Sequence, residues 1–156
     1  MHIAELLSKG RVWHNIAGDD APSAIRDAVL TLYGAQGIMA KDGPGADELC
    51  RSATEREELA STALGSGLAV PHPRAPLCKR PEDSLLALFY PRFPVPWKSP
   101  DDLPVRAFFI ILSANSAEHL ANLSSLSKLC MKDGFVELLL RESGLDELVS
   151  YLKGAS

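Results

Sequence analysis

The sequence lacks the features that mark membrane-spanning, exported and nucleic-acid-binding proteins. No uncharged apolar run is long enough to cross a bilayer, and the opening segment MHIAELLSKGRVW has no apolar core of signal-peptide length. The net charge is −4 and no run of Lys and Arg occurs, which disfavours a nucleic acid or an anionic membrane as partner. We therefore expect a soluble, cytoplasmic protein with no direct membrane insertion, whose partners are proteins or small molecules.

Cysteine is scarce as well. The three cysteines, Cys50, Cys78 and Cys130, lie far apart and form no CxxC pair, which argues against both a disulfide framework and a structural zinc site. We expect three reduced thiols that contribute mostly to packing.

The chain does contain enough apolar material for a substantial core. Its 156 residues are 46% hydrophobic, which fits one domain over residues 1–156. The apolar runs at residues 84–90 and 105–112 are rich in β-forming residues and predict central strands covered on both faces. The intervening residues 91–104 are rich in proline and predict an exposed loop or an edge hairpin.

Helices are expected before and after these strands. Asn115 can cap a helix with Glu118 three residues later, and this places His119 in the first helical turn. The predicted buried stripe of that helix consists of Leu120, Leu123, Leu126 and Leu129. The other predicted elements are one helical turn at residues 2–7, a short strand at 11–16, helices at 20–34 and 47–59, and helices opened by Asp133 and Ser143. Helices and strands are interspersed, so the class is α/β or mixed α+β, with one sheet covered by helices.

The most informative stretch is LGSGLAVPHPRAP at residues 64–76, in which a histidine stands between two prolines. Gly65 and Gly67 permit a sharp turn, and the apolar residues that follow are too few to be anything but a buried strand. The flanking prolines cannot continue a strand ladder, so His72 is expected at a strand end on a stiff loop. An imidazole in that position can carry a proton, a metal or a phosphoryl group.

Three segments follow one another along the chain: Arg56 with EELAST after it, GSGLAVPHPR around His72, and HLANLSSLSKL, which begins at His119. In this order and spacing they resemble the type-2 enzyme IIA domains of the bacterial phosphoenolpyruvate:sugar phosphotransferase system (PTS), a family with mannitol/fructose and nitrogen-related members. The likeness covers nearly the whole chain, including AELLSKGRVW, FPVPWKSPDDLPV and LDELVSYL. It implies an α/β fold with a single mixed β-sheet flanked by helices on both faces.

The resemblance also implies roles for individual residues. In that family a histidine at a strand end accepts a phosphoryl group from the phosphocarrier HPr, and His72 matches that histidine, with a tele-phosphohistidine expected. His119 matches the second active-site histidine, and Arg56 matches the active-site arginine. Both side chains would stabilise charge on the phosphoryl oxygens, so neither a metal nor another cofactor is expected.

Backbone N–H groups of the turn formed by Gly65, Ser66 and Gly67 are expected to help bind the phosphate. The sequence also departs from the family pattern close to the histidine. Pro73 stands where many members carry a small residue, so that position has no N–H. Ser66 stands where some sugar-specific members have an acidic residue, and Ala63 where glycine is common.

Two functions remain open within the resemblance. The first is phosphoryl relay from an HPr-type protein through His72 to the cysteine of a IIB component. The second is nitrogen-related regulation without sugar transport, in which phosphorylation changes the binding of target proteins. The chain shows no fused IIB or membrane domain, and its N-terminal segment resembles stand-alone nitrogen-related proteins, which favours regulation. A weaker alternative makes His14, His72 and His119 a metal site, on residue type alone.

Overall fold

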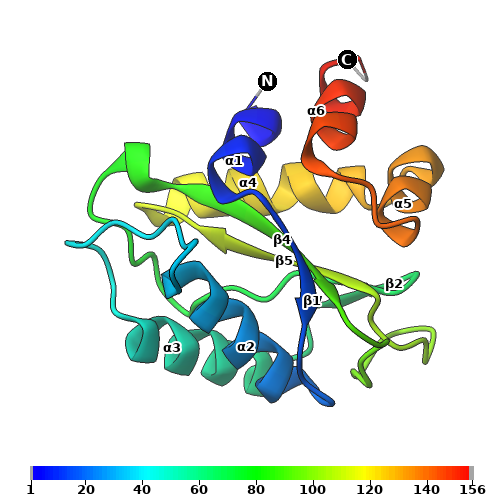
Figure 1. Ribbon diagram of the computed structural model, residues 1–156, viewed down its shortest axis with the longest axis horizontal. Helices are drawn as coiled ribbons and strands as arrows, with labels where there is room; N and C mark the ends of the chain where they lie inside the picture. Colours follow the sequence, from blue (N-terminus) through cyan, green and yellow to red (C-terminus); the bar gives the residue numbers. More distant parts are fainter. Residues whose placement is uncertain (1, 155–156) are drawn as a thin grey trace.

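The computed structural model describes residues 2–154. Helices and strands are interspersed along the chain, as the apolar patterns predict (Figure 1). The elements are α1 (His2–Gly10), β1 (Val12–Ile16), α2 (Ala21–Tyr33), α3 (Ala46–Leu59), β2 (Ala63–Gly65), β3 (Leu68–Ala69), a 3₁₀ turn η1 (Pro81–Asp83), β4 (Leu85–Pro91), β5 (Ala107–Leu112), α4 (Ser116–Leu129), α5 (Asp133–Leu140) and α6 (Leu145–Gly154).

The strands form one mixed sheet in the order β1-β4-β5-β3-β2. β1 pairs in parallel with β4, and β3 pairs in parallel with β5. The pairs β4/β5 and β2/β3 are antiparallel. The predicted fold, a single mixed sheet with helices on both faces, is confirmed.

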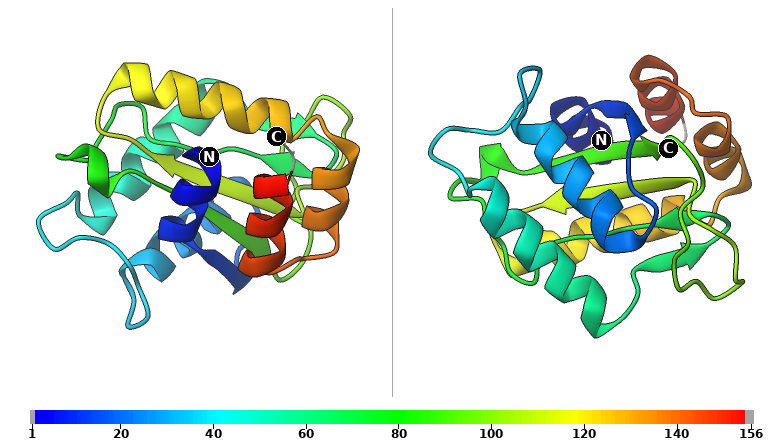
Figure 2. Two further views of the ribbon diagram at one scale, coloured as in Figure 1. Left: turned by 90° about the horizontal axis from the view of Figure 1, so that it is seen from above. Right: turned by 60° about the horizontal axis from the view of Figure 1, so that its bottom comes forward.

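The central strands β4 and β5 are buried along their whole length because helices cover both faces of the sheet. Successive side chains point to opposite faces, so Leu86 and Leu88 pack into one core while Ala87 and Phe89 pack into the other. The first core lies under α1, α4, α5 and α6, and the second lies against α2 and α3 (Figure 2).

Two segments, the first helix and the strand β2, differ from the prediction. The first helix has nine residues instead of a single turn. β2 was not predicted, because its three residues are too short to show an alternating pattern. It pairs with β3 through the turn at residues 65–67, so the segment before His72 is a small antiparallel hairpin at the edge of the sheet.

The buried stripe predicted for α4 is wrong at Leu120, which is 65% exposed. Each step of three residues turns a helix by about 300°, so leucines spaced by three spread over roughly half of its circumference. The inward face instead centres on Leu126, with Asn122 and Cys130 also buried. His119 shares this face, at i+3 spacing from Asn122 and i+7 from Leu126.

Helix starts were predicted with mixed success. Asn115 caps α4, since its Oδ1 accepts the Glu118 N–H at 2.8 Å. Asp133 is the first residue of α5 and not its cap, because Lys132 occupies the cap position. Ser143 does not cap α6, which begins at Leu145; its buried hydroxyl has no hydrogen-bond partner among the described residues.

The proline-rich residues 91–104 form a largely irregular loop between β4 and β5, which agrees with the predicted exposed loop. An isolated antiparallel bridge joins Val95 to Val105, and the Trp97 ring packs 5.7 Å from that of Phe108. None of the described helices combines the length and the apolarity that crossing a bilayer requires.

Candidate functional site

His72 lies just beyond β3, where the hairpin ladder ends. The last ladder bond runs from the Val70 N–H to the Thr62 carbonyl, at 3.2 Å, after which Pro71 offers no donor. The His72 side chain turns back so that its Nδ1 is 2.8 Å from the Val70 carbonyl oxygen. A carbonyl only accepts, so Nδ1 carries the proton in the neutral ring and Nε2 keeps the free electron pair.

His119 faces this imidazole from α4. The two ring centroids are 4.8 Å apart, with the planes inclined by 46°. The Asn115 cap fixes the start of α4, and the backbone N–H of His119 donates to the Asn115 carbonyl at 3.1 Å. Two segments far apart in the sequence thus present their imidazoles to each other.

Arg56 completes the cluster from the last turn of α3. Its Nη1 donates to the Ala60 carbonyl at 2.8 Å, which uses one of the five N–H donors of the guanidinium. Burial lowers the pKa of His119, and the positive charge of Arg56 lowers it further. The three residues predicted for the site, Arg56, His72 and His119, therefore lie close enough for the charge of Arg56 to affect both histidines.

The environment of His72 favours its neutral form. Burial is the main cause that lowers its pKa below the usual value of 6.5, and the charges of His119 and Arg56 act in the same direction. The hydrogen bond to Val70 and the charge of Glu57 oppose this shift. Near pH 7 the His72 ring is thus neutral, with the positive charge of Arg56 nearby.

The structure does not bring the turn at Gly65, Ser66 and Gly67 to His72. All three residues have left-handed φ angles, of 91°, 56° and 82°, and the turn lies at the other end of β3. Five extended residues place it roughly 16 Å from His72. The Ser66 N–H is moreover bound to Asp101 Oδ2 at 2.8 Å. The expected contribution of this turn to phosphate binding has no support in the structure.

The histidine metal site also fails on geometry. His14 lies on β1, at the opposite edge of the sheet from the β2/β3 hairpin, with its ring 5.1 Å from that of Tyr90. Among residues 2–154, no group of three or more His, Cys, Asp or Glu side chains is arranged to hold a metal ion.

Comparisons with known proteins agree with this geometry. Residues 5–155 match the model of the family "Phosphoenolpyruvate-dependent sugar phosphotransferase system, EIIA 2". This chain belongs to the type-2 EIIA family. The assignment confirms the resemblance carried by the segments around Arg56, His72 and His119.

Relatives of the EIIA chain include sugar-specific and regulatory proteins. It is 28% identical over 154 residues to the fructose-specific EIIABC component of Bacillus subtilis, covering 97% of this chain but only 23% of that protein. It is 27% identical over 131 residues to the nitrogen regulatory protein of Pseudomonas aeruginosa, covering 81% and 79% of the two chains.

Solved structures share its fold. Nitrogen regulatory protein IIA-Ntr from Neisseria meningitidis superposes with a TM-score of 0.79 and 27% identity, over 97% of this chain and 99% of that one. The mannitol IIA of Escherichia coli in its complex with phosphorylated IIB shares the fold, with a TM-score of 0.63, 20% identity, and coverage of 93% and 95%.

Glu57 contributes to the geometry beside the candidate site, and the sequence did not predict this. The Glu57 carboxylate accepts hydrogen bonds from the Thr62 N–H, the Thr62 hydroxyl and the indole Nε1–H of Trp97. The only sequence signal was its position next to Arg56. Its partnership with Trp97, 40 residues away, becomes visible only in three dimensions.

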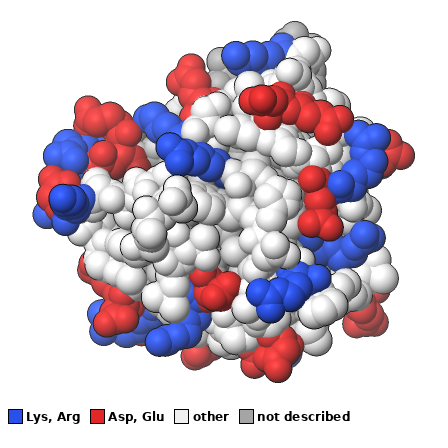
Figure 3. Space-filling model, viewed as in Figure 1, with Lys and Arg blue, Asp and Glu red and all other residues white. Residues whose placement is uncertain are grey.

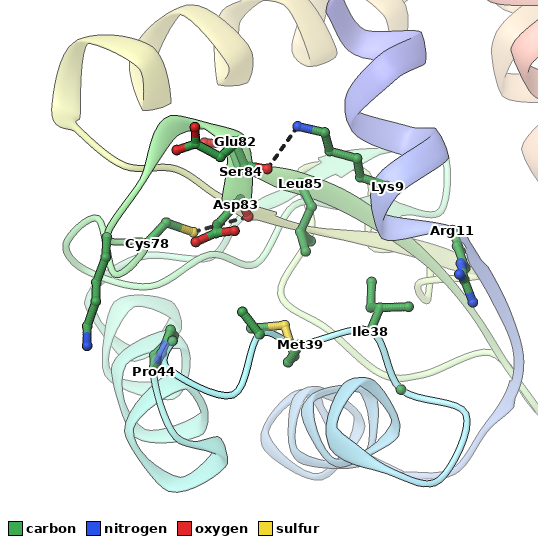
Figure 4. A pocket seen from close by; sticks show the side chains of 14 residues that line it. Lys9, Arg11, Ile38, Met39, Pro44, Cys78, Glu82, Asp83, Ser84 and Leu85 are labelled. Carbon is green, nitrogen blue, oxygen red and sulfur yellow. Dashed lines mark hydrogen bonds between the residues drawn. The ribbon is translucent and has the colours of Figure 1, made fainter.

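A separate hollow of about 400 Å³ lies between the α2–α3 connection and the start of β4 (Figure 4). Ile38, Met39 and Leu85 project into it, and none of the three predicted site residues lines it. The Cys78 thiol forms part of its wall, and burial raises the pKa of that thiol to about 11, which keeps it protonated and unreactive at neutral pH.

The surface carries charges of both signs. On the face shown in Figure 3, Lys and Arg side chains are interspersed with Asp and Glu, and neither sign forms a continuous field. This distribution agrees with the small net charge of −4, and that face has no continuous basic surface of the kind that binds nucleic acid.

Proposed function

We propose that this EIIA protein is a phosphoryl carrier whose His72 Nε2 accepts the phosphoryl group of an HPr-type phosphocarrier. The observation that carries the proposal is the buried, neutral imidazole of His72, whose Nδ1–H is held by the Val70 carbonyl. That hydrogen bond selects the tautomer and directs Nε2 as the nucleophile.

The transfer balances without a cofactor. The electron pair of Nε2 attacks the phosphorus of the donor phosphohistidine, and the N–P bond of the donor breaks with its electron pair returning to the donor nitrogen. His72 keeps its Nδ1–H, so the phosphorylated ring carries a positive charge, and the Val70 carbonyl stabilises it by accepting the hydrogen bond of Nδ1–H.

Arg56 and His119 would stabilise the phosphoryl oxygens. A guanidinium offers a planar fork to two oxygens, and a neutral imidazole offers one N–H donor. Pro73 removes the backbone N–H that follows His72, which makes these side chains more important here. Phosphoryl transfer depends mainly on such positioning and charge stabilisation.

Two destinations for the phosphoryl group follow from the relatives. In the relay function, it passes to a IIB cysteine, and the mannitol IIA of E. coli, which shares this fold, forms a complex with phosphorylated IIB. In the regulatory function, about two added negative charges change the binding of a target protein. The nitrogen regulatory relatives, matched over most of their length, favour the second destination.

The test is intact-protein mass spectrometry after incubation with phosphoenolpyruvate, enzyme I and HPr. The wild type and the matched control His14→Ala should gain one acid-labile phosphoryl group, and His72→Ala should gain none. Phosphorylation of His72→Ala would assign the acceptor elsewhere. No phosphorylation of the wild type by any of several HPr-type donors would overturn the carrier function.

A second measurement separates the two destinations. The phosphorylated protein is mixed with a fructose-type IIB component, and loss of its phosphoryl group to the IIB cysteine is followed by mass. Rapid transfer supports relay. A phosphorylated protein that remains stable beside several IIB components supports regulation.

A further inference from the structure

We infer that Glu57 is a positioning residue for His72, acting through a continuous chain of hydrogen bonds in the β2/β3 hairpin. The inference deepens the proposed function and rests on it for its effect on phosphorylation. Glu57 is separated from His72 by 15 positions in the sequence, and two backbone residues connect them in the structure.

The first link joins α3 to the segment that enters β2. Glu57 Oε2 accepts the Thr62 N–H at 2.8 Å, and Oε1 accepts the Thr62 hydroxyl at 2.6 Å. Thr62 is only 7% exposed, so these charge-assisted hydrogen bonds are largely shielded from solvent. They fix both the backbone and the side chain of Thr62.

The second link crosses the hairpin to the imidazole. The Thr62 carbonyl accepts the Val70 N–H at 3.2 Å, and the Val70 carbonyl accepts the His72 Nδ1–H at 2.8 Å. The prolines on either side of His72 fix their own φ angles, which leaves the loop little freedom to turn independently of Val70. The position of Thr62 is therefore transmitted to the ring.

Trp97 anchors the other side of the carboxylate. Its Nε1–H donates to Glu57 Oε2 at 2.9 Å, while its ring packs against Phe108 of β5. Glu57 and Trp97 also line a hollow of about 800 Å³ between α2, the end of α3 and residues 96–102, so the indole borders solvent. The Glu57 carboxylate thus connects α3 to Thr62 at the start of the hairpin and to Trp97 in the proline-rich loop of residues 91–104.

The negative charge of Glu57 adds a second effect. Burial, His119 and Arg56 lower the pKa of His72, and the charge of Glu57 acts in the opposite direction. The Nδ1–H of the phosphorylated ring, which carries positive charge, is stabilised by a nearby carboxylate. Position and charge can be separated, because Glu57→Gln keeps the side-chain shape and one acceptor oxygen while removing the charge.

The experiment compares Glu57→Ala and Glu57→Gln with Glu58→Ala, an exposed carboxylate on the same helix turn. The phosphorylation rate is measured against the concentration of phosphorylated HPr. Glu57→Ala should lower the saturating rate by about ten- to hundredfold with little change in half-saturation, since the ring is misplaced and docking is intact. Glu57→Gln should lie closer to wild type, and Glu58→Ala within about twofold of it.

A readout that overall stability would not move is the tautomer of His72, measured by ¹⁵N NMR of the imidazole. The wild type and Glu58→Ala should hold Nδ1–H, and Glu57→Ala should show a mixture of both tautomers. If Glu57→Ala does not fold, Glu57→Asp, which keeps the charge but shortens the side chain by one methylene and so withdraws the carboxylate from Thr62, replaces it in both measurements. A wild-type rate together with an unchanged tautomer in the folded variant would overturn the inference.

The same experiment separates this inference from the proposed function. If the wild type is not phosphorylated but the tautomer of His72 depends on Glu57, the carrier function fails and the positioning role stands. If the wild type is phosphorylated at His72 and Glu57→Ala behaves like Glu58→Ala, only the positioning role fails.

Discussion

The imidazole of His72 lies 4.8 Å, centroid to centroid, from the imidazole of His119. Protonation of either ring places a positive charge beside the other, and Arg56 already supplies one. The pair is therefore held neutral at pH values where an ordinary histidine begins to titrate. This state suits His72 for accepting a phosphoryl group and leaves His119 with one N–H to donate.

The rate of His72 phosphorylation should be constant above about pH 6.5 and fall only below it, as the depressed pKa of His72 is reached. The reason is that only the neutral ring is nucleophilic. Initial rates measured between pH 5 and pH 8, with pre-phosphorylated HPr at saturating concentration, provide the check. A rate that halves at pH 7 would contradict the neutral assignment.

The free energy of unfolding should also depend on pH through His72. Below the ordinary value of 6.5 the unfolded chain binds a proton that the buried His72 resists, so unfolding is favoured as pH falls through this range. The contribution is fully present above about pH 6.5. Melting temperatures of wild type and His72→Gln, compared from pH 5 to pH 8, should differ in slope only on the acidic side.

Replacing Arg56 by Gln should raise the pKa of both His72 and His119, because the positive charge that lowers them is gone. Phosphorylation should nevertheless slow by about a hundredfold, since the phosphoryl oxygens lose a charged donor. Histidine pKa values from NMR titration and rates from mass spectrometry test both parts. Arg51→Gln, an exposed position on the same helix, is the matched control and should change neither.

Gly65→Ala should destabilise the protein by about 1 to 3 kcal/mol without slowing phosphorylation. Its φ of 91° is unfavourable for alanine, and an added Cβ would meet Asp101 Oδ2 at 3.2 Å. Gly154→Ala, where an added Cβ meets nothing within 4 Å, is the control. Chemical denaturation measures the stability. A loss of phosphorylation in a folded Gly65→Ala protein would restore the turn as part of the site.

Leu126→Ala should cost about 2 to 5 kcal/mol, because this side chain is fully buried under α4. Leu120→Ala should change stability by less than about 0.5 kcal/mol, because Leu120 is 65% exposed. Urea unfolding of both variants tests the inward face of the helix. Equal losses would support the stripe expected from leucine spacing.

Local chemistry made much of this protein predictable from its sequence. The runs that became β4 and β5 combine β-forming residues with continuous apolarity, which is typical of strands buried on both faces. Asn115 signals the start of α4 because a cap is decided within three residues. The prolines around His72 likewise place that residue at a strand end, since their missing N–H groups act locally.

Other features depend on contacts that no local pattern contains. β2 exists because the turn after it brings β3 alongside, and the inward face of α4 is chosen by the sheet beneath it and not by the spacing of its leucines. The Ser66 N–H, which the family resemblance places at the phosphate, instead donates to the Asp101 carboxylate, 35 positions away in the sequence.

The sequence by itself determined the types of all the helices and of the strands other than β2, the strand-end position of His72 and the family to which the chain belongs, because these follow from short-range propensities and motif order. Only the tertiary structure decided that His119 faces His72, that the Val70 carbonyl holds Nδ1 of His72 and leaves Nε2 without that partner, and that Glu57 is bound to both Thr62 and Trp97. The physical reason is that distances between side chains far apart in the chain are set by packing, and pKa values and tautomers follow from those distances.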